Sequence, residues 1–537
     1  MNFLQKNMRL CFGLMIVGAT TFSCKKVLDV QPYTSFANTT AFTNASRVEA
    51  AMNGVYDAAQ SGFYAGGAVR GYPFGAANIE QGDMRGEDML NQALFYQVTY
   101  ESTQNPTTAN QEFMFNTLYS LINKANLMIE GVTDAGKGGI VSEERVNQYV
   151  AESRFLRAMA HHELLIHFAR PYADGNGNKL GVIYRETGID SDAEVQAAKD
   201  AKRSTVAENY AKILADLDFA EANLPVHAKD DKGAEIKTFR ASKAAAIALK
   251  TRVKLHMRDW AGVITEGNKL VPASAPFTSS IGGWALTAAP SGPFNISTPS
   301  VENIFSIRNS SVDNAGVNGA LANMYSPASI GGRELVRVSP IIYNHPAWLC
   351  DDKRRAMLTT TGSGASLNYL TTKYKDPTTS SDAAPQIRYA EVLLNVAEAE
   401  ARSNAGVSAR AVSLLNAVRD RALASPATQS YTVASFATAN DLIRAILNER
   451  RIEFLAEGKR WADIHRLAVD PVFGGGIPEK IGTGVGTAAM YQCGTGAAGY
   501  ATAAKVAAIP YNDYRFIWPI PLSERQQNPN YEQNPSY

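Results

Sequence analysis

Apolar residues recur at helical spacing along much of the chain. Ile387, Ala390, Leu394, Ala397 and Ala401 follow one another at intervals of three and four, which places them on one face of a helix. Similar stripes and their flanking breakers predict helices at roughly 43–60, 111–131, 143–169, 205–223, 241–255, 260–270, 387–401, 408–423, 443–454 and 459–468. The pattern therefore predicts a mainly α fold.

Short breakers such as Leu224-Pro225 and Glu457-Gly458 separate several of these predicted helices. Helices joined by short connections become antiparallel neighbours, and alanine-lined faces let them approach closely. Helix starts near 204 and 240 lie 36 residues apart, close to the period of tetratricopeptide repeats. Long insertions interrupt this period elsewhere, so the repeat is local.

The first residues have the features of a secretory signal. Met1–Ser23 carries basic residues followed by a short apolar run that ends in small residues. Cys24 follows directly, as in a bacterial lipobox, where the cysteine is acylated and becomes the new N-terminus. Thr21 stands where that motif usually has leucine. We expect a signal peptide at 1–23, a lipidated Cys24 with a tether over 24–41, and one domain over 42–537.

Pro, Gly, Ser, Thr and Asn replace the helical pattern in three long stretches. These stretches span 62–110, 271–385 and 471–508. Long irregular segments in a compact protein usually form functional surfaces or covers. The domain is therefore predicted to have a helical scaffold at about 42–270 and 386–470, a loop-rich insertion at about 271–385 and a C-terminal loop segment at 471–537.

Composition excludes some classes of function. The 52 basic and 51 acidic residues leave a formal net charge of +1, so no surplus of cations favours a nucleic-acid partner. The chain has four cysteines and no CxxC motif, too few for a disulfide framework or a zinc ribbon. An oxidising compartment would permit a bond between Cys350 and Cys493, which the residues alone leave open.

Motifs for nucleotide, metal and nucleophilic chemistry are incomplete. Gly131–Lys137 fits GxxxxGK, but Gly138 replaces the Ser or Thr that would hold Mg²⁺. Gly494–Gly499 fits GxGxxG without a preceding strand, and His162–His167 is one residue too long for HExxH. We therefore predict no cofactor, no metal site and no catalytic residue.

Charged and apolar residues alternate from Glu449 to Arg466. Arg450 and Glu453, and likewise Arg460 and Asp463, are three positions apart and could pair along a helix. Taken alone, this stretch predicts a helix with salt bridges along its surface.

The same stretch resembles the E-R-R-x-E-x-x-x-E-G-x-R-W-x-D pattern of the SusD/RagB family of outer-membrane nutrient-binding lipoproteins. Further similarities follow in the family's order: Cys24 with Leu28-Asp29 and Pro32, Arg154-Phe155-Leu156-Arg157-Ala158, His167-Phe168-Ala169-Arg170-Pro171, Asp351-Asp352-Lys353-Arg354, Ile387-Arg388-Tyr389-Ala390-Glu391, Phe516-Ile517-Trp518-Pro519-Ile520-Pro521 and Asn528-Pro529-Asn530. The resemblance covers essentially the whole mature chain.

The resemblance implies a SusD-like fold of tetratricopeptide-like helix hairpins with a large irregular ligand-binding face. It further implies a non-catalytic, surface-exposed protein of the outer membrane, held by lipid on Cys24. Such a protein would bind an oligosaccharide and deliver it to a SusC-like, TonB-dependent barrel. Capture of peptides or other nutrients, as in RagB, is the alternative within the family. Lys25 and Lys26 depart from the acidic residues that often follow the lipidated cysteine of exported members.

A sugar site needs an aromatic platform, which faces the apolar side of the ring, and polar groups around its hydroxylated rim. Trp284 lies in a loop after two glycines and is the tryptophan best placed for this role; Trp260, Trp348, Trp461 and Trp518 are predicted to be structural. The other candidate ligand-binding residues, chosen for loop position and chemistry, are Tyr72, Phe74, Asp83, Arg85, Tyr96, Tyr325 and Arg333.

Two alternative hypotheses assign the protein to other classes of function. A surface glycoside hydrolase would use two carboxylates about 5–10 Å apart, which sequence spacing cannot reveal. A tetratricopeptide-like adaptor would bind a protein partner and no small ligand.

Overall fold

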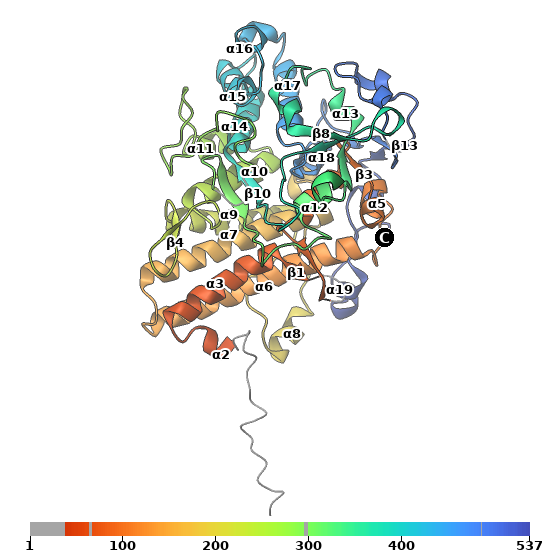
Figure 1. Cartoon of the computed structure of the whole chain (residues 1–537). Helices are drawn as coiled ribbons and strands as arrows, with labels where there is room; N and C mark the ends of the chain where they lie inside the picture. The colour runs from red at the N-terminus through yellow and green to blue at the C-terminus, as the bar shows by residue number, and fades with distance from the viewer. Residues whose placement is uncertain (1–37, 64–66, 295–298, 485) are drawn as a thin grey trace, which may run out of the picture.

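The computed structural model describes residues 38–63, 67–294, 299–484 and 486–537 (Figure 1). The predicted signal peptide and Cys24 lie outside the described residues. The helices are α2 (Asn38–Ala41), α3 (Ala45–Gln60), α4 (Ala77–Arg85), α5 (Leu94–Glu101), α6 (Ala109–Lys137), α7 (Glu143–Phe168), α8 (Asp192–Ala198), α9 (Val206–Asn223), α10 (Lys243–Met257), α11 (Trp260–Gly267), α12 (Leu321–Tyr325), α13 (Pro340–Tyr343), α14 (Tyr389–Ser403), α15 (Ala409–Asp420), α16 (Pro426–Gln429), α17 (Ala439–Glu453), α18 (Lys459–Leu467) and α19 (Leu522–Gln527).

Short strands pair in twos and are all antiparallel. The pairs are β1 (Gly62–Phe63) with β2 (Val69–Tyr72), β3 (Met89–Asn91) with β7 (Val336–Val338), β4 (Ala228–Lys229) with β5 (Glu235–Ile236), β6 (Asn303–Ile307) with β10 (Ala384–Arg388), β8 (Leu358–Thr361) with β9 (Asn368–Thr371), β11 (Gly476–Ile477) with β14 (Ile509–Pro510), and β12 (Lys480–Ile481) with β13 (Lys505–Val506). The β3–β7 and β6–β10 pairs join segments far apart in the sequence and so hold the insertion to the scaffold.

The ten predicted helices are confirmed, and so is the mainly α fold. Their starts follow capping chemistry, because Ser142 and Thr205 accept hydrogen bonds from backbone N–H groups of the first turn of α7 and α9. Consecutive helices pack as hairpins, with α6 against α7 and α10 against α11 (Figure 1). The scaffold is thus a layered stack of helix pairs.

Helices α4 and α5 lie in the stretch 62–110, where an irregular segment was predicted. In α4, Gln81, Asp83 and Arg85 are buried although they are polar. A helix is predicted from a stripe of apolar residues, and a helix that buries polar side chains lacks such a stripe.

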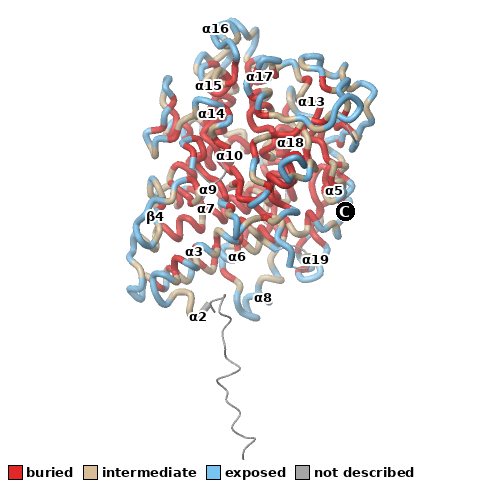
Figure 2. Tube along the Cα trace, viewed as in Figure 1, coloured by how far each residue is buried: buried red, intermediate tan, exposed pale blue. Residues whose placement is uncertain are grey.

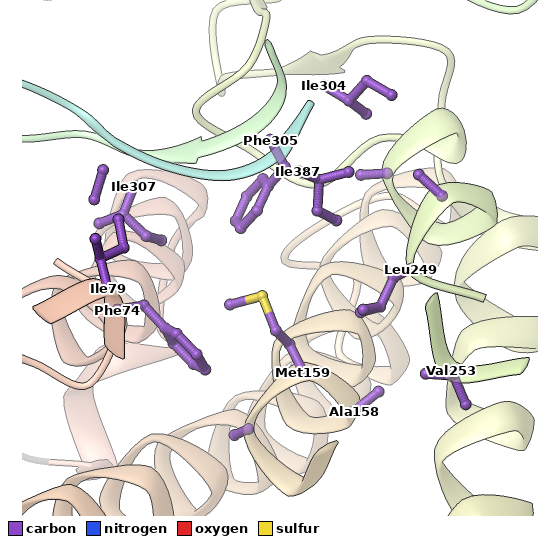
Figure 3. Packing of buried hydrophobic residues seen from close by; sticks show 14 of the residues in the cluster. Phe74, Ile79, Ala158, Met159, Leu249, Val253, Ile304, Phe305, Ile307 and Ile387 are labelled. Atoms are coloured by element: carbon purple, nitrogen blue, oxygen red, sulfur yellow. The ribbon is translucent and has the colours of Figure 1, made fainter. Parts of the chain in front are cut away.

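Buried residues run through the middle of the molecule, and exposed residues lie on its periphery (Figure 2). Phe305 of β6 and Ile387 of β10 face the helices α7 and α10, where Met159 and Leu249 meet them (Figure 3). The Phe155 and Phe305 rings pack edge to face, with their centroids 5.0 Å apart. The insertion is therefore anchored in the same core as the helices.

The predicted pairs Arg450–Glu453 and Arg460–Asp463 do not form. Arg450 contacts Asp463 of the next helix, with 2.9 Å between Nε and Oδ2, and Arg460 contacts Glu87 with 2.7 Å between Nη2 and Oε1. These side chains face other elements and are not on one solvated helix face. The motif joins distant segments, which spacing within one helix cannot show.

Glu453 lies at the centre of a buried ionic cluster. Its carboxylate contacts Arg388, Arg421 and Arg354 at 2.9, 2.7 and 3.1 Å. The three guanidinium groups lower the pKa of Glu453, although burial alone would raise it. Residues from the insertion, the helical scaffold and the family-like motif thus meet at one carboxylate.

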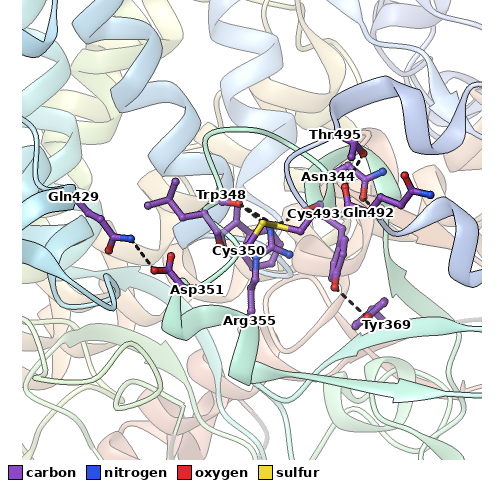
Figure 4. Close-up of a disulfide and its surroundings, with 12 residues drawn as sticks. Asn344, Trp348, Cys350, Asp351, Arg355, Tyr369, Gln429, Gln492, Cys493 and Thr495 are labelled. Atoms are coloured by element: carbon purple, nitrogen blue, oxygen red, sulfur yellow. Dashed lines mark hydrogen bonds between the residues drawn. A yellow bond between two sulfur atoms is a disulfide. The ribbon is translucent and has the colours of Figure 1, made fainter.

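Cys350 and Cys493 form a disulfide, with 5.7 Å between their Cα atoms (Figure 4). The bond joins the loop-rich insertion to the C-terminal loop segment across a sequence separation of 143 residues. Asn344 holds the same two segments together through hydrogen bonds with Met490 O and Gln492 N.

In the described ranges, every helix is too short or too polar to cross a bilayer.

Candidate functional site

Seven of the eight candidate ligand-binding side chains are buried, whereas the sequence predicts them on an exposed face. Trp284 keeps 3% of its surface exposed and belongs to the main hydrophobic core. Its ring packs edge to face on His227, with centroids 5.7 Å apart, and a Cβ on Gly282 would lie 2.7 Å from its Nε1. Trp284 anchors its own loop because its large apolar ring is more stable under that loop than in water. Its role in ligand binding stays an untested prediction.

Tyr72, Phe74 and Tyr96 are buried as well. Phe74 lies in the core close to Ile79 (Figure 3), and the hydroxyl of Tyr72 accepts a hydrogen bond from Gln81 Nε2 at 3.2 Å. The absence of an apolar period in their stretch predicts these aromatic residues on the irregular face. They instead hold that stretch on the scaffold.

Asp83 and Tyr325 come from different loop-rich stretches and do meet, but inside the protein. Tyr325 donates its hydroxyl hydrogen to Asp83 Oδ2 at 2.6 Å, and Gly458 N donates to the other carboxylate oxygen at 2.9 Å. Burial raises the pKa of Asp83 to about 7, although these two hydrogen bonds lower it. Close by, Tyr96 donates to Glu80, whose pKa burial raises to about 8. This is a buried polar cluster that fastens α4.

Arg85 is enclosed between aromatic rings. Its guanidinium carbon lies 3.3 Å from the centroid of Trp461 and 4.9 Å from that of Trp518. The side chain donates to Phe516 O at 2.5 Å, and burial lowers its pKa. A cation stacked between two indoles with its donors occupied is a structural element. Of the eight candidates, only Arg333 is exposed, and its Nη1 donates to Asn318 Oδ1 at 2.8 Å.

An open cleft of about 310 Å³ lies beside the C-terminal half of α3. We call it the α3 cleft; its lining residues are Asn53, Tyr56, Asp57, Gln60, Ile236, Phe239, Arg240, Ile307, Arg308, Asn309, Ser310 and Asp313. This volume is at the lower end of the range for small-molecule pockets, and the open side leaves room for a longer chain to continue. The lining residues between 53 and 240 belong to the helical scaffold, and those between 307 and 313 belong to the loop-rich insertion.

The floor of the α3 cleft is rigid. Gln60 Nε2 donates to Asn309 Oδ1 at 3.1 Å and to Asp313 O at 2.9 Å. Tyr56 donates its hydroxyl hydrogen to Glu152 Oε2 at 2.7 Å, beneath the cleft. Side chains fixed in this way are suited to recognition, because little conformational freedom is lost when a ligand binds.

Three buried polar side-chain atoms of the lining residues have no hydrogen-bond partner among the described residues. They are Gln60 Oε1, an acceptor, and Arg240 Nε and Nη2, both donors, and both side chains are almost completely buried; the Nε atom still lies 2.9 Å from Glu152 Oε2. A buried polar atom without a partner costs about 1–3 kcal/mol.

Phe239 and Tyr56 are half-buried aromatic residues of the cleft lining, and the guanidinium carbon of Arg308 lies 5.8 Å from the ring centroid of Phe239. Asp57 and Asp313 are exposed at the opening. Burial, and next the neighbouring Asp57 carboxylate, raise the pKa of Asp313. The cleft thus combines an aromatic face with carboxylate, amide and guanidinium groups, the combination expected for a sugar.

Sequence reasoning missed the lining of the α3 cleft. Asp57 and Gln60 lie in a correctly predicted helix, but nothing in the spacing of α3 marks its C-terminal half as different. The run Ser310–Asn314 was recognised only as part of a polar loop. In the described ranges, no group of three or more His, Cys, Asp or Glu residues could hold a metal ion.

Two family models match the chain. The model described as the SusD family matches residues 358–537, and the model described as "Starch-binding associating with outer membrane" matches residues 26–255. Residues 256–357, which include most of the loop-rich insertion, lie between the two matches.

Whole-chain comparisons agree with these matches. A SusD-like protein of Formosa agariphila is 23% identical over 509 residues, covering 86% of this chain and 91% of the relative. A crystal structure of a SusD superfamily protein from Bacteroides fragilis is 25% identical, has a TM-score of 0.72 and covers 92% of this chain and 100% of that chain. A structure named as a laminarin binding SusD-like protein has a TM-score of 0.66 at 19% identity, with 92% and 100% covered. Sequence models at both ends and a shared fold between them lead to one conclusion: the chain belongs to the SusD/RagB family.

Proposed function

We propose that the protein binds an oligosaccharide in the α3 cleft and does not cleave it. The observation that carries this proposal is the half-buried ring of Phe239 in an open cleft of about 310 Å³ that carboxylate, amide and guanidinium side chains also line. The apolar face of a sugar ring would cover the aromatic ring, while sugar hydroxyls exchange hydrogen bonds with exposed polar lining residues such as Asp57 and Asp313. The laminarin-binding relative of the same fold supports a glycan as the ligand.

Replacing Phe239 with alanine is expected to lower the affinity for the bound oligosaccharide by about tenfold, since an aromatic contact contributes roughly 0.5–1.5 kcal/mol beyond the area it buries. Isothermal titration calorimetry with a panel of oligosaccharides and short peptides measures this. Tyr514→Ala is the matched control, because Tyr514 is exposed and lies outside the cleft lining. Equal losses in both variants, or binding of peptides only, would contradict the proposal.

Trp284→Ala separates the α3 cleft from the platform inferred from sequence. Because Trp284 is buried in the core, its removal is expected to lower the unfolding temperature and leave the affinity of the folded protein unchanged. A loss of affinity without a loss of stability would show that Trp284 is part of the binding site.

Glycoside hydrolysis is the second candidate, favoured by the two carboxylates Asp57 and Asp313 at the cleft opening. Glycoside hydrolases that retain the anomeric configuration and those that invert it both use such a pair of carboxylates. Prolonged incubation of the purified protein with its bound oligosaccharide, followed by chromatography, distinguishes the candidates. We expect the ligand to be recovered intact; shortened products that disappear in Asp57→Asn would establish an enzyme.

We further propose that acylated Cys24 holds the protein on the outer membrane, where it delivers its ligand to a SusC-like, TonB-dependent barrel. The family model's description of outer-membrane association supports this placement. A Cys24→Ala variant is expected to leave the membrane fraction, while the wild type stays there and can be cross-linked to a large barrel. Membrane retention of the variant, or failure to incorporate labelled fatty acid into the wild type, would contradict the anchor.

A further inference from the structure

The charges around the α3 cleft do not cancel. Asp57 and Asp313 have no ion-pair partner in the described part of the chain, and both are exposed at the cleft opening. Among the lining residues, Arg240 and Arg308 are the two cations. Whether the cleft attracts or repels an anion depends on how far these two cations are already neutralised.

Arg240 is neutralised from below. Its Nη1 lies 2.7 Å from Glu49 Oε1, and its Nε lies 2.9 Å from Glu152 Oε2. Two carboxylates therefore face one guanidinium, and burial raises the pKa of Glu152 in this crowded position. Arg240 therefore supplies no free positive charge to the cleft.

Arg308 is left as the exposed cation of the lining, opposite two exposed carboxylates. It lies over the ring of Phe239, 5.8 Å from the centroid, where the aromatic face partly offsets its charge. Asp57 and Asp313 line the same cleft, and burial, followed by the Asp57 carboxylate, raises the pKa of Asp313. An anionic ligand would add a third negative charge there, and like charges placed together oppose binding.

We propose that the α3 cleft selects uncharged glycans and rejects glycans that carry uronate or sulfate groups, with Asp57 and Asp313 as the specificity-determining residues. This inference rests on the proposed binding of oligosaccharides in the same cleft. Carboxylates accept hydrogen bonds from sugar hydroxyls, so the same two groups favour a neutral ligand and exclude an acidic one.

The test compares matched ligand pairs. Neutral oligosaccharides of α-glucan, β-glucan, galactan and xylan are each titrated beside a chemically sulfated counterpart, with the full mature protein at low and high salt. We expect the neutral member to bind at least tenfold more tightly at low salt. High salt is expected to narrow this ratio, because screening weakens repulsion between exposed charges.

In Asp57→Asn/Asp313→Asn, the ratio of neutral to sulfated affinity is expected to fall about tenfold, mainly through tighter binding of the sulfated ligand. Asparagine keeps an acceptor oxygen of similar shape, and circular dichroism verifies folding. Asp200→Asn is the matched control, because Asp200 is exposed and lies outside the cleft lining; its ratio should not change.

Two results would overturn the inference and leave glycan binding intact. One is a wild type that binds the sulfated member as tightly as the neutral one or more tightly. The other is a double variant whose ratio equals that of the wild type. If no oligosaccharide of either kind binds, the proposed function itself fails, and the inference fails with it.

Discussion

Arg388→Ala is expected to lower the free energy of unfolding by about 3–5 kcal/mol, the cost of removing one partner from a buried ion pair. Arg388 is 2% exposed and contacts three carboxylates, those of Glu302, Glu453 and Glu457, at 2.5, 2.9 and 2.8 Å. Without the guanidinium, these buried negative charges lose a common cation and repel one another. Urea unfolding followed by circular dichroism measures the change.

The pH dependence of this variant gives a second readout. Burial raises the pKa values of Glu453 and Glu457, but nearby cations that include Arg388 hold both below normal in the wild type. Loss of Arg388 raises both values, so these carboxylates become protonated, and the stability deficit shrinks, as the pH falls. The deficit relative to the wild type should therefore be larger at pH 7 than at pH 4.5. Lys137→Ala is the control, because its pair with Asp134 is exposed and contributes little. A deficit below about 1 kcal/mol at pH 7 would show that the remaining cations of the cluster suffice.

Removal of the Cys350–Cys493 bond is the second large effect we expect. Linking residues that are 143 positions apart restricts the unfolded chain strongly, and loop entropy sets an upper limit of about 5 kcal/mol on the stabilisation. Cys350→Ala/Cys493→Ala should lose about 2–5 kcal/mol in the free energy of unfolding. The native contacts of Asn344 with the C-terminal segment should persist, since they do not depend on the sulfur atoms.

Reductant supplies the matched comparison for the disulfide. The wild type with its two thiols freed should unfold at the same urea concentration as the double alanine variant, and the variant should not respond to reductant. If mass spectrometry shows free thiols and the reduced wild type has the same urea midpoint of unfolding as the oxidised wild type, the bond does not contribute to stability.

Helices could be predicted well because their signals are local. The apolar stripe of 387–401 and the capping residues Ser142 and Thr205 act within a few residues of one another, and each predicted helix is present. Helix α4 was missed since its buried side chains are polar and find their partners only in other segments, as Asp83 does with Tyr325. A pattern read along the chain cannot indicate a partner 242 positions away.

The binding residues were placed on exposed loops because long aromatic-containing loops often carry function. Trp284, Tyr72 and Tyr96 instead bury their rings, as large aromatic side chains do when the fold offers a hydrophobic core. The α3 cleft has its polar lining from three separate segments, and only their packing leaves polar atoms such as Gln60 Oε1 without partners.

The sequence by itself determined the helical scaffold, the positions of the irregular segments and, through motifs at both ends, membership of the SusD/RagB family. Helix propensity, capping and apolar periodicity are short-range, and a family motif is read directly from residue order. Only the tertiary structure decided which charges pair, that Cys350 and Cys493 meet, and which polar groups line an open cleft. Those properties depend on burial and on distances between segments remote in sequence, which are fixed when the loops pack against the helices.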